Sequence, residues 1–67
     1  MRSMISAMCY TNNATGKTSL AYISYNTLAE VQKEAERINR EKPERLRTGE
    51  PARCSERTYW AQEQEEF

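Results

Sequence analysis

The sequence predicts a small α+β domain with the element order β-β-α-β: a hairpin, one amphipathic helix and a third antiparallel strand. Two short apolar runs separated by turn-forming residues predict the hairpin, a capped stripe at helical spacing predicts the helix, and an alternating segment near the C-terminus predicts the last strand. A chain of 67 residues is one domain, and domains of this size have a thin core. We expect the domain to span residues 1–61 and an acidic, disordered tail to occupy residues 62–67.

The hairpin is predicted from residues 4–10 and 18–25, which contain no acidic residue and are rich in aromatic, apolar and small side chains. The segment between them contains Asn12, Asn13 and Gly16, which favour turns. Its end, Gly16-Lys17-Thr18, is similar to a phosphate-binding loop, but Thr11 stands where that loop has its first glycine and a strand follows where it needs a helix. We therefore interpret the segment as a turn.

A period of two assigns the hairpin side chains to faces. In the first strand Ile5, Ala7 and Cys9 share one face, and Met4, Met8 and Tyr10 share the other. In the second strand Leu20 and Tyr22 share one face, and Ala21, Ile23 and Tyr25 share the other. Both faces are partly apolar, so the pattern does not say which face is buried.

The helix is predicted from Thr27 to Lys42. Thr27-Leu28-Ala29-Glu30 fits a capping box, with Asn26 as the competing cap, and Pro43 stops the helix. Four apolar residues at spacings of three, four and three form the stripe that we expect to pack on the sheet: Leu28, Val31, Ala35 and Ile38. The following residues, up to Pro51, are predicted to form a loop.

Residues 52–60 have two interpretations. Their alternation favours a third strand, which would complete a stable sheet. The alternative is a helix from Ser55 onward, because residues 61–66 are good helix formers. We favour the strand.

The charges are unevenly distributed although the net charge is zero. All ten acidic residues are glutamates at or after Glu30, and the stretch from Arg37 to Arg57 holds seven bases against four acids. Three interpretations of this basic stretch stay open: a solvated surface with many salt bridges, a protein-binding face, or a nucleic-acid-binding module that stacks bases on Tyr59 or Trp60. The candidate partner-binding residues are arginines and aromatic residues, the types enriched at interface hot spots: Tyr10, Tyr22, Arg37, Arg40, Arg45, Arg47, Arg53, Arg57, Tyr59 and Trp60.

The composition gives no support for catalysis or for a bound metal or cofactor. The chain contains no histidine and no aspartate, so general-base and metal-ligand chemistry lack their usual residues. The two cysteines are expected to be reduced thiols, with a Cys9–Cys54 disulfide as the alternative. No run has the length of a membrane span and the N-terminus lacks a signal-peptide core, so we expect a cytoplasmic protein that is not an enzyme.

The layout resembles that of small accessory proteins encoded by bacteriophages and mobile elements. The shared features are the small size, a hairpin, one capped helix, a last strand and an acidic tail. Some of those proteins inhibit a host enzyme, the transcription machinery or a CRISPR complex. The resemblance lies in the architecture and carries over no functional residue. It implies an inhibitor that blocks a host protein or complex by occluding its surface. Nucleic acid is the less favoured partner, no membrane is expected, and pairing of two copies through a strand edge is a third hypothesis.

Overall fold

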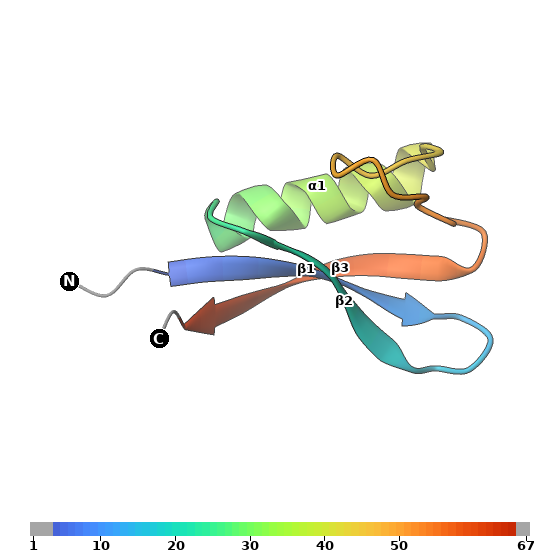
Figure 1. Cartoon of the computed structure of the whole chain (residues 1–67), viewed down its shortest axis with the longest axis horizontal. Coiled ribbons are helices and arrows are strands. Elements are labelled where there is room, and N and C mark those ends of the chain that lie inside the picture. The colour runs from blue at the N-terminus through green and yellow to red at the C-terminus, as the bar shows by residue number, and fades with distance from the viewer. Residues whose placement is uncertain (1–3, 66–67) are drawn as a thin grey trace.

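The computed structural model describes residues 4–65, which form three strands and one helix (Figure 1). The elements are β1 Met4–Asn12, β2 Thr18–Ser24, α1 Leu28–Glu41 and β3 Arg57–Glu65. The sheet order is β2-β1-β3, and the central strand β1 is antiparallel to both neighbours. α1 therefore carries the chain from one edge of the sheet to the other, and the predicted β-β-α-β architecture is confirmed.

α1 begins and ends at the predicted signals. Thr27 is the N-cap, and its Oγ1 accepts a hydrogen bond from the Glu30 N–H at 3.3 Å. At the other end Lys42 adopts a left-handed conformation with φ of 53°, immediately before Pro43. Three residues of the predicted stripe, Val31, Ala35 and Ile38, are buried, and Leu28 is half-buried.

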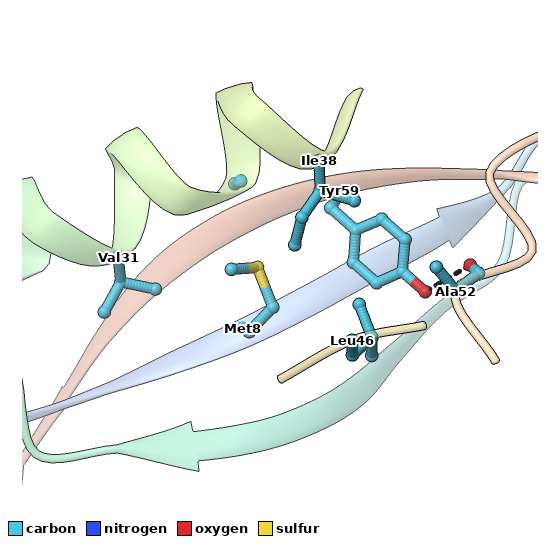
Figure 2. Packing of buried hydrophobic residues seen from close by; sticks show 7 residues of the cluster. Met8, Val31, Ile38, Leu46, Ala52 and Tyr59 are labelled. Carbon is cyan, nitrogen blue, oxygen red and sulfur yellow. Dashed lines mark hydrogen bonds between the residues drawn. The ribbon is translucent and has the colours of Figure 1, made fainter. Parts of the chain in front are cut away.

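The core lies between α1 and one face of the sheet, and the segment between α1 and β3 closes it. Figure 1 shows this segment on the same side of the sheet as α1. Its two buried residues, Leu46 and Ala52, pack with Met8 and Tyr59 of the sheet (Figure 2). The Tyr59 hydroxyl donates a hydrogen bond to the Ala52 carbonyl, so the loop is fixed to β3 through the core. No element among residues 4–65 covers the opposite face of the sheet in Figure 1.

The third strand is confirmed, but its bounds differ from the predicted residues 52–60. Arg53 has φ of 51°, and the Glu56 N–H donates to the Arg53 carbonyl at 2.9 Å, so a turn occupies the expected first half of the strand. β3 then starts at Arg57 and continues to Glu65 in unbroken register with β1. Residues 62–65 are thus strand rather than a disordered tail, because β1 is long enough to pair with them; residues 66–67 lie outside the described range.

A bulge in β2 changes which side chains share a face. Tyr22 pairs with Met8 and Leu20 pairs with Cys9, so one step along β1 corresponds to two steps along β2, where one step would be regular. Leu20 therefore lies on the open face while Tyr22 packs against the core, although a strict period of two predicted one face for both. Ala21, the additional residue, packs partly against the core and does not share the face of Ile23.

Both faces of the central strand are buried, for different reasons. Met8 lies in the core beneath α1. Ala7 and Cys9 point to the open face and are covered by their cross-strand neighbours, with Leu20 on one side of Cys9 and Trp60 on the other. Cys9 and Cys54 are both free thiols, as expected.

Candidate protein-binding site

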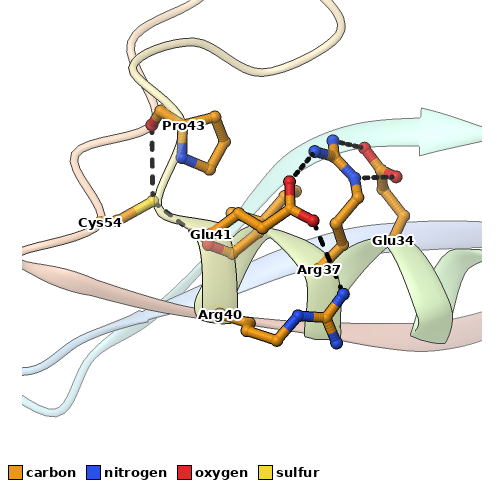
Figure 3. Close-up of polar contacts among 7 residues, drawn as sticks. Glu34, Arg37, Arg40, Glu41, Pro43 and Cys54 are labelled. Atoms are coloured by element: carbon orange, nitrogen blue, oxygen red, sulfur yellow. Dashed lines mark hydrogen bonds and ion pairs between the residues drawn. The ribbon is translucent and has the colours of Figure 1, made fainter.

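The predicted arginines separate into two groups with different surroundings. In the helix group, Arg37 binds Glu34 at 2.7 Å and Glu41 at 3.2 Å, and Arg40 lies 3.6 Å from Glu41 (Figure 3). The hydrogen bond from Arg37 lowers the pKa of the Glu34 carboxyl, and the same bond raises the pKa of Arg37. The helix group thus forms a local ion-pair network on the surface, which matches the interpretation of a surface with salt bridges.

The loop group consists of four arginines that lie in or directly after the segment between α1 and β3: Arg45, Arg47, Arg53 and Arg57. Among residues 4–65, the ion pairs involve Arg37 and Arg40 and none of these four. Arg45 Nη1 donates to the Gly49 carbonyl at 2.9 Å, so this side chain helps to hold the loop. The other three guanidinium groups keep hydrogen-bonding capacity for a partner.

Two of these arginines line a surface hollow of about 210 Å³. Tyr10, Ala21 and Leu46 line it from the helix side of the sheet, with Leu20 at the strand edge, and Arg53 and Arg57 provide its positive charge. Glu50 is the carboxylate in the lining. The hollow thus offers two guanidinium groups beside a tyrosine ring in a mostly polar lining, an arrangement that suits a carboxylate on another protein.

Arg57 is held in place before any partner binds. Its guanidinium carbon lies 3.9 Å from the centroid of the Tyr10 ring, within the range of a cation–π contact. The Tyr10 ring in turn packs on Tyr59, with centroids 5.8 Å apart and planes tilted by 53°. The nearby Tyr59 hydroxyl is the main cause that raises the pKa of Arg57, so the group stays charged. The loss of side-chain entropy on binding is therefore smaller for Arg57 than for a freely moving arginine.

The four predicted aromatic residues occupy different places. Tyr59 is 2% exposed and belongs to the core, so its prediction as a partner-binding residue is wrong; its hydroxyl is bound within the domain. Tyr10 and Tyr22 are half-buried on the helix side, and burial is the main cause that raises the pKa of Tyr22. Trp60 lies on the open face, where its Nε1–H donates to Thr11 Oγ1 at 3.1 Å. The structure therefore brings Tyr10 to the arginines of the loop and separates Trp60 from them.

Three exposed apolar residues were missed by the sequence-based prediction. Leu20, Ile23 and Tyr25 are 54%, 38% and 78% exposed, and they are the exposed large hydrophobic residues among those the structure describes. All three lie on β2 or directly after it. The available signal was that both faces of residues 18–25 are apolar, so one of the two had to face solvent.

The candidate residues lie on a small α+β domain. Within residues 4–65 no group of three histidine, cysteine or acidic side chains is placed to hold a metal ion. In the same range no helix is long and apolar enough to cross a membrane. The chain matches no protein-family model, no curated protein and no solved structure.

Proposed function

We propose that the protein is a small non-enzymatic inhibitor, of the kind that phages and mobile elements encode, which binds a host protein or a CRISPR-type defence complex and occludes its surface. The observation that carries this proposal is the loop group of arginines, which lack carboxylate partners within the described chain. Two of them, Arg53 and Arg57, line a surface hollow beside Tyr10. A partner surface with a carboxylate beside an apolar side chain would complete both the charge and the packing.

A protein partner is favoured over nucleic acid by the acids interleaved with these arginines. Glu44, Glu50 and Glu56 lie in the same segment, and Glu50 lines the hollow itself. A phosphate backbone would be repelled by these carboxylates, and binding to it would weaken steeply with salt. A protein surface of mixed charge can place a lysine or arginine against them.

The proposed mechanism is steric: the arginines and aromatic side chains of the surface bind the target and cover it. Cys9 is buried with a raised pKa, the cause being desolvation, so its thiol is a poor nucleophile. Inhibition by occlusion is stoichiometric, and it leaves the target chemically unchanged. One copy of the chain per target site is the expected end point of a titration.

The test is affinity capture from the native host with matched charge-reversal variants. Arg53→Glu and Arg57→Glu change the hollow, and Arg40→Glu makes the same charge change on a helix side chain that is 71% exposed. We expect a partner that co-purifies with the wild type and with Arg40→Glu, and that is lost with the two variants of the hollow. Equal retention by all three variants would remove the hollow from the proposal, and sub-stoichiometric inactivation of the target would contradict a steric mechanism.

A further inference from the structure

The two edges of the sheet differ in how they are protected. Unpaired edge strands offer free N–H and C=O groups to other chains, and proteins usually block them with charges or by covering them. At β3 the Asn39 side chain binds both backbone groups of Tyr59, and charged residues such as Arg57 and Glu63 lie in the strand. This edge is therefore covered near its centre.

The β2 edge has less of this protection, and only Ser24 at its end is buried. Thr18–Ser24 contains no charged residue and no proline. Within residues 4–65 no loop backbone or side chain donates to or accepts from the backbone of these seven residues outside the β1–β2 ladder. The bulge at Ala21 is the single irregularity along the edge. The exposed residues Leu20, Ile23 and Tyr25 are concentrated here.

We propose that the β2 edge is a self-association site, at which β2 pairs antiparallel with β2 of a second copy around a two-fold axis. The pairing would join two three-stranded sheets into one sheet of six strands. It goes beyond the proposed function, since it uses the backbone of the strand edge and not the arginines of the hollow, although Leu20 and Ala21 belong to both.

A second copy fits this edge because the strand is complementary to itself. Antiparallel pairing centred on Ala21 places no two like charges opposite each other, because Thr18–Ser24 is uncharged. The same register places Lys17 at one end opposite Tyr25 of the other copy. Tyr25 is 78% exposed, so its ring face can accept the ammonium group. The two-fold axis creates this contact twice.

The bulge limits the strength of the pair. It divides each strand into two short runs, Thr18–Leu20 and the residues Tyr22 and Ile23 before the buried Ser24, and each run pairs with the other run of the second copy. The contact area is smaller than that of a standard interface, so the dimer should be weak and dependent on concentration. We expect a monomer at about 10 μM and a growing dimer fraction toward about 1 mM, on the scale of weak transient interfaces.

Sedimentation velocity of the full chain across this concentration range tests the proposal, with two lysine variants as a matched pair. Ile23 and Gln62 both pair with Ala7, on opposite sides of it and on the same face. Ile23→Lys places a charge at the β2 edge and should abolish the dimer, while Gln62→Lys should leave it unchanged. Equal loss in both variants would show that the open faces pack together and would overturn edge pairing.

A third variant tests the proposal even if Ile23→Lys does not fold. Tyr25 lies outside the strand and is highly exposed, so Tyr25→Ala should fold as the wild type does. Loss of its contact with Lys17 should raise the dissociation constant about two- to fivefold. Slower amide exchange of β2 at high concentration in the wild type would support the pairing. A chain that stays monomeric at every concentration would overturn the proposal. The occupant of the β2 edge would then be an extended segment of another protein.

Discussion

The Asn39 side chain binds the backbone of Tyr59 in the way that a neighbouring strand would. Its Nδ2 donates to the Tyr59 carbonyl at 2.8 Å, and its Oδ1 accepts from the Tyr59 N–H at 2.8 Å. In an antiparallel sheet, two residues opposite each other exchange the same pair of bonds. One helical side chain thus closes the β3 edge above the most buried aromatic residue and fixes α1 to the sheet beyond its apolar contacts.

Asn39→Ala should therefore lower the free energy of unfolding by about 1–3 kcal/mol, because it leaves the N–H and C=O of Tyr59 without their partners. Urea unfolding with linear extrapolation measures the change. The matched control is Arg40→Ala, the next residue, whose exposed side chain should contribute less than about 0.5 kcal/mol. Equal stability of the two variants would show that water replaces the amide at no cost.

The main elements could be predicted from the sequence because their signals are local. The Thr27 cap, the stripe ending in Ile38 and the stop at Pro43 each depend on a few adjacent residues, and each lies where the pattern indicated. The bulge at Ala21 depends on how β2 meets β1, so no local pattern reveals it. The length of β3 depends in the same way on β1, because residues 62–65 form a strand by pairing with it.

The candidate site could be predicted in composition but not in arrangement. Arginines and tyrosines were expected to meet, and Arg57 does lie on Tyr10. The division into paired helix arginines and unpaired loop arginines follows from Arg37 lying one turn from both Glu34 and Glu41. Burial of Tyr59 follows from the start of β3, which the turn at residues 53–56 delays and the sequence pattern misplaced.

Lys42→Gly should increase stability. Lys42 has φ of 53°, a conformation that costs an L-residue about 1–2 kcal/mol and that glycine adopts without this penalty. Glycine loses more backbone entropy on folding, so the net gain should be about 0.5–1 kcal/mol. The control Lys33→Gly, at an exposed position inside α1, should instead cost about 1 kcal/mol. The opposite signs in urea unfolding would confirm that the helix ends in the left-handed residue, and a loss in both variants would contradict it.

The Glu34–Arg37 pair predicts a loss of stability in acid. The hydrogen bond from Arg37 lowers the pKa of Glu34 in the folded state below its unfolded value of about 4.3. The unfolded chain therefore binds this proton first as the pH falls, so the stability from the pair is complete above the unfolded pKa and is lost as the pH falls through the folded one. Glu34→Gln has no charge at this position at any pH, so it never has the stability that the pair contributes. Its difference from the wild type in free energy of unfolding should therefore be largest at pH 7 and should shrink toward pH 3. Urea unfolding across this range measures the difference.

Glu36→Gln is the control, since Glu36 is exposed and makes no ion pair within residues 4–65, and its difference from the wild type should vary less with pH. A difference for Glu34→Gln that stays constant from pH 7 to pH 3 would show that the pair does not stabilise the folded chain through the charge of Glu34.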